Sequence, residues 1–344
     1  MTRPIPFIVA GIAALAGAAG AASAVKGVSK MRDANNLVES ANRRHKRNIR
    51  RLEESNKEAD RAMDELGTLE LQILKSFEDF ASVFEKIKNK PTFAAYEKEN
   101  VKLPEFDGTK LKEVSVGAGV LLGGIEGAGL GAAGGFAAAG ATTAAVMALG
   151  TASTGTAIAS LSGAAATNAT LAALGGGAIA AGGGGMALGS MILGGATLGV
   201  GLLVGGIIFN ITGSNLTDKA DEVWGEMKRA ERKMDRARAY LDKLHQTADT
   251  YKDQLKNVQL IYQDHLDDLK DQVEEQGRTD WRTYTSEEKK LTENTVLLVG
   301  LLYAMCKVRL VLKGDNDELN TINEASIQKS LTDSKKILAD NFEG

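Results

Sequence analysis

Glycine-rich loops are the first candidates for chemistry in this sequence, because glycine backbones can cradle a phosphate group. The densest run is LAALGGGAIAAGGGGMALG at residues 171–189. A P-loop also needs a lysine and a hydroxyl residue after its glycines, and no lysine lies near this run. A G-x-G-x-x-G motif occurs at Gly129, Gly131 and Gly134. No acidic residue follows it about 20 positions later to bind a ribose, so we expect no nucleotide and no other cofactor.

The histidines and the cysteine do not form a catalytic or metal-binding pattern. His45 lies in the basic run NRRHKRNIRR, which is typical of a solvated helix face or of a patch that meets anionic lipid. His245 and His265 would lie about 30 Å apart on one straight helix, too far to share a metal ion. Cys306 lies among apolar residues and is predicted to be an inert buried thiol. We therefore predict no enzyme, no metal and no small-molecule substrate.

Charge is distributed very unevenly along the chain. One quarter of the 344 residues are charged, yet no Asp, Glu, Lys or Arg occurs from Gly127 to Thr217. Of the 39 glycines, 28 fall between Val114 and Gly213. An apolar stretch of this length would aggregate if it were exposed to water. The net charge of −3 and the absence of an evident basic domain give no reason to expect nucleic acid as a partner.

The spacing of the glycines favours a membrane domain over residues 114–213. Glycine costs about 1 kcal/mol per residue relative to alanine in a helix in water, whereas in lipid small residues four apart let helices pack closely. Two or four membrane crossings are expected, with 191–211 the strongest candidate. The predicted helix-packing glycines are Gly119, Gly123, Gly127, Gly131, Gly135, Gly185, Gly189, Gly195, Gly199, Gly201 and Gly205.

Glu126 is the one charged residue within 114–213, and it lies between Gly123 and Gly127 in the sequence. Charges at membrane depth are costly and are often functional. Glu126 is therefore a candidate pore-lining or pH-sensing residue, with a carboxyl group kept neutral near an interface as the alternative.

The N-terminal stretch PFIVAGIAALAGAAGAASAV at residues 6–25 is uncharged and close to the roughly 20 residues that span a bilayer. AASA at 21–24 resembles a cleavage site, so a cleaved signal peptide and a buried helix stay open as alternatives. The basic residues mostly follow this stretch, and the positive-inside rule then keeps residue 26 onward in the cytoplasm. We expect an uncleaved segment in a bacterial inner membrane, or else a secreted soluble form that inserts into a target membrane.

Two long helices must position these segments. The first, at 26–90, repeats apolar residues every seven positions, with Asn56 and Glu70 as polar interruptions expected near the solvent edge. The second, at 214–280, alternates spacings of three and four from Leu216 to Leu269, with His265 the clearly polar seam residue. Residues 91–113, with two prolines, are predicted to be an irregular connector, and 281–344 to be helices and a tail. The fold class is all-α: a long antiparallel bundle or coiled coil with an apolar membrane-inserting hairpin.

Two stretches carry a resemblance to uncharacterised bacterial glycine-rich membrane proteins. They are STGTAIASLSGAAATNATLAALGGGAIAAGGGGMALG at 153–189 and LGTLELQILKSFEDFASVFEKIKN at 66–89. The resemblance implies no particular activity. At the level of architecture the chain is also similar to helical pore-forming toxins, colicin pore domains and apolipoprotein L.

The predicted function is membrane insertion with pore formation or gating, in a role that fits a bacterial conflict or defence effector. The partners expected are a lipid bilayer and either further copies of this chain or a helical protein. The alternative is a constitutive membrane-anchored coiled-coil scaffold or tether without conductance.

Overall fold

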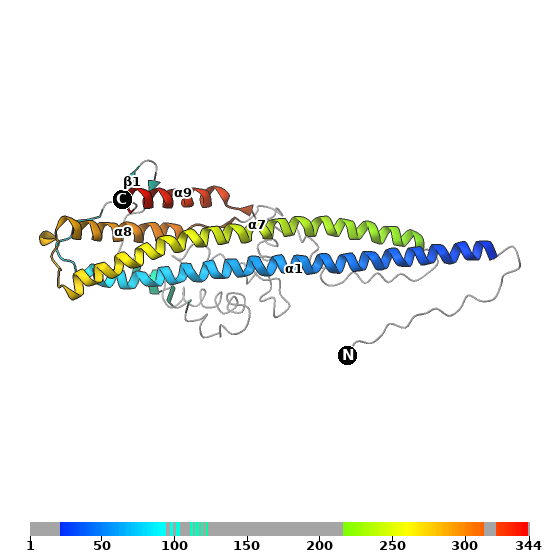
Figure 1. Cartoon of the computed structure of the whole chain (residues 1–344), viewed down its shortest axis with the longest axis horizontal. Helices are drawn as coiled ribbons and strands as arrows, with labels where there is room; N and C mark the ends of the chain where they lie inside the picture. The colour runs from blue at the N-terminus through cyan, green and yellow to red at the C-terminus, as the bar shows by residue number, and fades with distance from the viewer. Residues whose placement is uncertain are drawn as a thin grey trace, which may run out of the picture. The chain divides into compact units, whose positions relative to one another are not determined.

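The computed structural model describes residues 21–93, 97–98, 101–103, 111–112, 114–116, 118–119, 122, 216–312 and 321–342. These residues are mostly helical, which confirms the all-α class (Figure 1). The elements with described bounds are α1 (Ala21–Lys86), β1 (Glu97–Lys98), β2 (Val101–Lys102), α7 (Leu216–Lys270), a π-helical turn (Asp271–Glu275), a 3-10 turn (Trp281–Thr283), α8 (Ser286–Cys306), β3 (Val311–Leu312), β4 (Thr321–Ile322) and α9 (Glu324–Asn341).

The chain divides into two compact units. The first unit is drawn from Met1–Arg50 and Leu202–Met234, and the second from Arg51–Gly201 and Asp235–Gly344. The helices α1 and α7 each contribute residues to both units.

In the second unit α1 and α7 run parallel, so the antiparallel prediction is wrong. The Lys252 Nζ atom lies 2.7 Å from Glu65 Oε2, and Lys86 Nζ lies 2.7 Å from Glu274 Oε1. Residue numbers on the two helices therefore rise together, as their colours do in Figure 1. The prediction assumed the short connection that joins antiparallel neighbours. The actual connection, residues 87–215, is long enough to return along a 66-residue helix, which extends on the order of 100 Å.

The predicted seam of α7 is buried along most of its length. Buried positions alternate spacings of three and four from Ala220 to Tyr262, and the next buried residue is Leu266 in place of the predicted His265. A straight helix drifts about 20° per heptad from a strict seven-residue repeat, which accounts for the one-position shift near the end of this helix. The side chain of Leu216, the first predicted seam residue, lies outside those described.

The core of the second unit contains Glu70 and Asn56, which the sequence places near solvent. Their exposed fractions are 0% and 3%, so that expectation is wrong. Both residues keep the heptad position of their apolar neighbours, and α7, α8 and α9 supply residues to the same core. Phe77 of α1 and Tyr262 of α7 meet there edge to face, with ring centroids 6.1 Å apart.

The helices α8 and α9 complete this core. Thr285 and Glu288 form a capping box that starts α8. The Tyr251 hydroxyl of α7 donates to the Met305 carbonyl at 2.9 Å and lies 2.8 Å from Ser330 Oγ of α9. This hydroxyl therefore joins three helices. The apolar stretch 295–306 forms the buried half of α8.

The connector between the long helices contains a short pair of strands, β1 and β2, rather than being irregular throughout. Beyond it, Leu111, Val114, Ala118 and Leu122 are buried in the core of the second unit. Ser115 Oγ donates to the Lys75 carbonyl at 2.6 Å. The core thus includes the first described residues of the stretch 114–213, which the sequence predicts to be a membrane domain. Within the described part of the chain, no helix combines the length and apolarity that a bilayer crossing requires.

Candidate functional site

The first unit is held together by a small apolar cluster and one ionic contact. Ala41 of α1 packs with Val223 and Met227 of α7. Glu231 Oε1 accepts hydrogen bonds from Arg44 Nε at 2.7 Å and from Asn48 Nδ2 at 3.0 Å. The hydrogen bond from Arg44 holds the pKa of Glu231 below its usual range. These contacts fix which part of α1 lies beside which part of α7.

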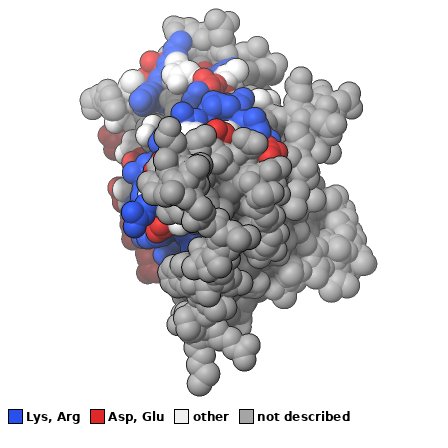
Figure 2. Space-filling view, turned by 90° about the vertical axis from the view of Figure 1, so that its right-hand side faces the viewer, with Lys and Arg blue, Asp and Glu red and all other residues white. Residues whose placement is uncertain are grey.

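The surface of the first unit is rich in basic side chains. The exposed basic residues described in this unit are Arg32, Arg43, Lys46, Arg47 and Arg50 on α1, and Lys228, Arg229, Arg232 and Lys233 on α7. Figure 2 shows Lys and Arg side chains gathered on the described residues of one face, with Asp and Glu among them. The expectation that no basic domain stands out is therefore wrong. The two basic stretches are far apart in sequence, and the pairing of α1 with α7 brings them into one unit.

Most of the predicted functional residues lie outside the described residues. This holds for Glu126 and for all the predicted helix-packing glycines except Gly119. At Gly119 a Cβ atom would meet no described atom within 4 Å. The described residues around Gly119 therefore give no steric reason for a glycine at this position.

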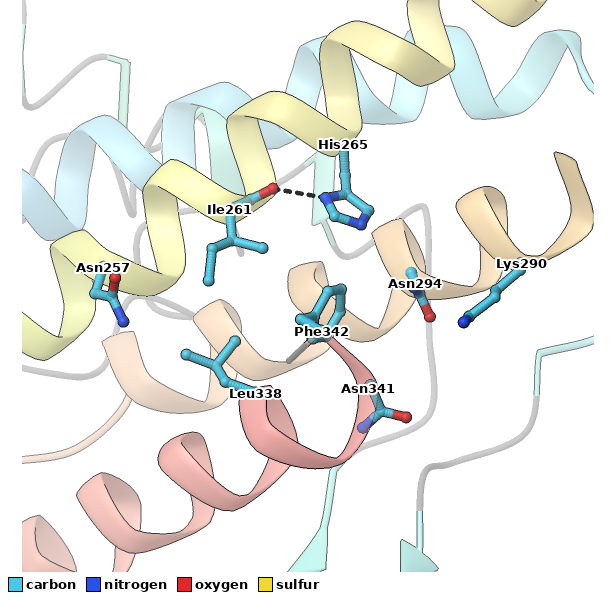
Figure 3. Close-up of a pocket in the computed structure, with 8 residues that line it drawn as sticks. All are labelled: Asn257, Ile261, His265, Lys290, Asn294, Leu338, Asn341 and Phe342. Carbon is cyan, nitrogen blue, oxygen red and sulfur yellow. Dashed lines mark hydrogen bonds between the residues drawn. The ribbon is translucent and has the colours of Figure 1, made fainter. Parts of the chain in front are cut away.

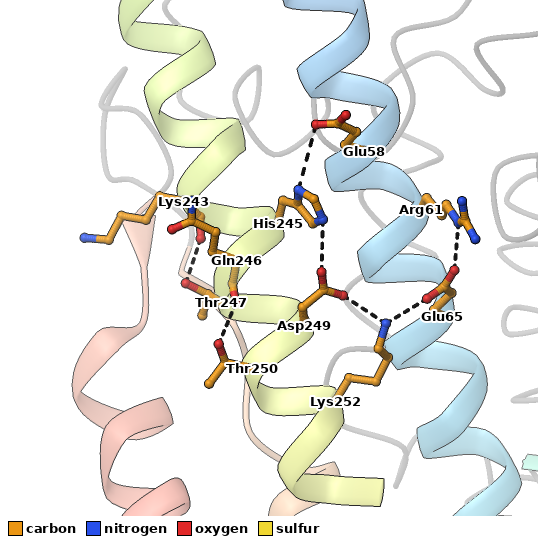
Figure 4. A network of polar contacts seen from close by, with 10 residues as sticks. All are labelled: Glu58, Arg61, Glu65, Lys243, His245, Gln246, Thr247, Asp249, Thr250 and Lys252. Atoms are coloured by element: carbon orange, nitrogen blue, oxygen red, sulfur yellow. Dashed lines mark hydrogen bonds and ion pairs between the residues drawn. The ribbon is translucent and has the colours of Figure 1, made fainter.

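In the second unit a polar network links α1 to α7 (Figure 4). Lys252 Nζ lies 2.7 Å from Glu65 Oε2 and 2.9 Å from Asp249 Oδ1. We call Lys252, Glu65 and Asp249 the clasp. The hydrogen bond from Lys252 lowers the pKa of both carboxyl groups. Burial alone would lower the pKa of Lys252, but its two carboxylate partners together raise it.

His245 adjoins the clasp, with Nε2 3.0 Å from Asp249 Oδ2 and Nδ1 3.9 Å from Glu58 Oε2. Among the described residues, no group of three side chains that could hold a metal ion occurs. Because it joins α1 to α7, the network is suited to fixing the register of the two helices.

Cys306 is a free and buried thiol, as the sequence predicts. Burial raises its pKa well above the usual range, and the nearby Glu70 carboxylate raises it further. The same two causes raise the pKa of Tyr251. A protonated, inaccessible thiol is a poor nucleophile, and Cys306 contributes to the packing of the core.

A cavity of about 380 Å³ lies beside His265, between α7, α8 and the end of α9 (Figure 3). The His265 Nδ1 atom lies 2.9 Å from the Ile261 carbonyl, and the imidazole ring contacts Phe342 edge to face at 5.1 Å between centroids. The other lining residues are Asn257, Lys290, Asn294, Leu338 and Asn341. His265 thus faces this cavity instead of the seam.

Sequence reasoning missed the clasp and the basic surface on α7. Both consist of charged residues on the outer faces of long helices, where a charged residue has no distinctive signal. The basic run on α7, KRAERKMDRAR at 228–238, was visible, but its neighbour on α1 could be identified only from the structure.

Comparison with known proteins gives no family for this chain, since no family model, curated protein or solved structure matches it.

Proposed function

We propose that this protein inserts its glycine-rich segment into a lipid bilayer and forms or gates a pore there as an oligomer. The observation that carries this proposal is the parallel pairing of α1 with α7. The helix α1 begins at Ala21, within the apolar segment 6–25, and α7 begins at Leu216, shortly after the apolar segment 191–211. Because the early parts of both helices belong to the first unit, both apolar segments connect to the same unit and can enter one membrane.

The composition of the described core supports the same proposal. Among the described residues, the large apolar side chains left exposed are Val116, Leu260 and Leu312. These offer little apolar surface for covering the uncharged residues 127–217. Hydrocarbon is a medium in which such a segment can be stable, since burial in lipid removes apolar surface from water and favours close helix packing.

In this proposal the parallel long helices form a coiled coil outside the membrane. The glycine faces pack membrane helices together, and Glu126 lines or gates the pore. The membrane domain starts after Leu122, because the residues up to that point are part of the core of the second unit.

Release of an encapsulated dye from liposomes tests the proposal. The full chain is expected to release dye, and Gly127→Leu is expected to abolish release because leucine blocks the close approach of helices. Gly225→Leu is a matched control, since a Cβ atom at Gly225 would meet only the flexible end of Arg229 at 3.9 Å. Absence of release by the wild-type chain under all conditions would reject a pore.

The second candidate is a membrane-anchored scaffold without conductance. The clasp and the closed core of the second unit favour it, because a helix pair fixed in register suits a rigid tether. In this case the chain resists extraction from membranes by carbonate but releases no dye. Carbonate extraction together with dye release therefore separates the two candidates.

A further inference from the structure

We infer that the first unit docks on the headgroups of an anionic lipid bilayer through the basic side chains of α1 and α7. This inference rests on the proposed membrane function and adds the class of lipid that the protein selects. It concerns the described surface of the first unit and not the apolar segments themselves.

The first unit carries a charge opposite to that of the whole chain. Residues 21–50 and 216–234 contain 13 Lys and Arg against 7 Asp and Glu, whereas the whole chain has a net charge of −3. Three of these acidic residues are engaged within the unit: Glu39 pairs with Arg43, Glu231 with Arg44, and Glu226 with Arg229. Basic side chains therefore outnumber acidic ones on this unit, which favours a negatively charged external partner.

The contacts between α1 and α7 place the basic residues of both helices at the same height along the helix pair. Lys46, Arg47 and Arg50 lie one turn or less apart on α1 and are exposed. The contacts of Glu231 with Arg44 and Asn48 bring residues 44–48 beside residue 231. The exposed Lys228, Arg232 and Lys233 lie within one turn of that residue. Each basic residue near an anionic membrane surface adds about 1 kcal/mol of attraction.

Trp224 gives this surface a second property of membrane interfaces. Its side chain is partly buried against the apolar cluster of the first unit, and Lys228 Nζ lies 5.7 Å from the centroid of its ring. Tryptophan prefers the headgroup level of a bilayer, where one part of the ring is apolar and another is polar.

Nucleic acid is the competing partner, since its phosphates attract the same side chains. Lipid is favoured because the apolar segment 6–25 runs into the start of α1 and the apolar segment 191–211 lies shortly before the start of α7. A basic surface next to membrane segments is the arrangement that recognises anionic lipid.

Binding of the full chain to vesicles tests the inference. Vesicles of phosphatidylcholine alone are compared with vesicles in which a third of the lipid is phosphatidylserine. Binding is expected to be strong only with phosphatidylserine, and to weaken as salt is raised from 0.1 M to 1 M, which shortens the screening length from about 10 Å to about 3 Å. The triple variant Lys46→Glu, Arg47→Glu, Arg50→Glu is expected to bind roughly a hundredfold more weakly.

The matched control reverses three exposed lysines on the same helices in the second unit: Lys57→Glu, Lys75→Glu and Lys256→Glu. This control has the same net charge as the triple variant and is expected to bind within about threefold of wild type. An equal loss of binding in both triple variants would overturn the inference, because it would reflect net charge alone. Tighter binding of duplex DNA than of phosphatidylserine vesicles would also overturn it.

Tryptophan fluorescence adds a readout that locates the contact. In a Trp281→Phe chain, Trp224 emission is expected to shift to shorter wavelength when phosphatidylserine vesicles are added. In a Trp224→Phe chain, Trp281 in the second unit is expected not to shift. Equal dye release from vesicles with and without phosphatidylserine would reject the lipid selectivity while leaving the proposed membrane function intact. No binding to either vesicle would reject both.

Discussion

Lys252 joins the two long helices of the second unit through two carboxylates. Its side chain is 21% exposed, while those of Glu65 and Asp249 are 43% and 41% exposed. Water therefore screens the interaction and limits its contribution to stability. The buried residues around it, such as Leu255 at 0%, contribute more, because core packing is not screened in this way.

We predict that Lys252→Met lowers the free energy of unfolding by about 1 kcal/mol, since the variant loses two partly screened charge-assisted hydrogen bonds. Urea denaturation measures the change. Lys256→Met is the matched control, because Lys256 is exposed on the same helix, and surface substitutions usually stay within about 0.5 kcal/mol. Equal effects of the two substitutions would show that the clasp contributes nothing specific.

The clasp also predicts a dependence of stability on pH. The pKa values of Glu65 and Asp249 are lowered in the folded state from 4.5 and 3.8. A lowered carboxyl pKa adds stability above the unfolded value, and this stability is lost as pH falls through the folded value. As the pH falls from neutral to below the folded-state pKa values of Glu65 and Asp249, the free energy of unfolding is therefore expected to fall further in wild type than in Lys252→Met. A difference between the denaturant midpoints of the two proteins that stays constant over this pH range would contradict the prediction.

At the scale of elements, α7 contributes to the core mainly through the buried residues of its seam. We predict that Leu255→Ala destabilises the second unit by about 2–5 kcal/mol, because it leaves a cavity in a packed core. Leu260→Ala, at a residue 52% exposed on the same helix, is expected to cost less than about 0.5 kcal/mol. Thermal or urea unfolding of the two variants compares them directly, and similar losses would mean that the seam is not buried.

The direction of α1 relative to α7 gives a second prediction at this scale. Spin labels at residues 57 and 243 are expected to lie close together, and labels at residues 57 and 263 farther apart by about 30 Å along the axis. An antiparallel pair cannot satisfy the first distance together with the ion pairs Glu65–Lys252 and Lys86–Glu274. Electron–electron distance measurements in a Cys306→Ser chain provide the test, and a reversed order of the two distances would contradict the parallel pairing.

Sequence patterns predicted what depends on local periodicity and missed what depends on long-range pairing. The α7 seam could be predicted because apolar residues at spacings of three and four can share one face of a helix. The direction of pairing could not be predicted, because the long connection 87–215 permits either direction. The burial of Glu70 was missed because a carboxylate in a heptad position gives no sign of which residues from α7, α8 and α9 surround it. The candidate membrane residues Gly123–Gly205 and Glu126 lie outside the described residues and stay predictions.

At the scale of the whole molecule, the two units differ in charge and in what they adjoin. The first unit is basic and is continuous in sequence with both apolar segments, while the second unit contains the closed core, the clasp and the buried Cys306. In the proposed function, this division of charge would let the first unit lie against anionic lipid, since basic residues are attracted to anionic headgroups.

The central claim is that hydrocarbon is the medium in which the uncharged segment of this chain works. The most direct test places an environment-sensitive fluorophore on Val200→Cys in a Cys306→Ser chain, with the label on Lys256→Cys as the control. On addition of phosphatidylserine vesicles, the label at residue 200 is predicted to shift to shorter wavelength and to be quenched by a lipid-attached quencher, while the label at residue 256 is not. A label at residue 200 that is already shielded from a water-soluble quencher before lipid is added, and that does not respond to vesicles, would contradict the claim.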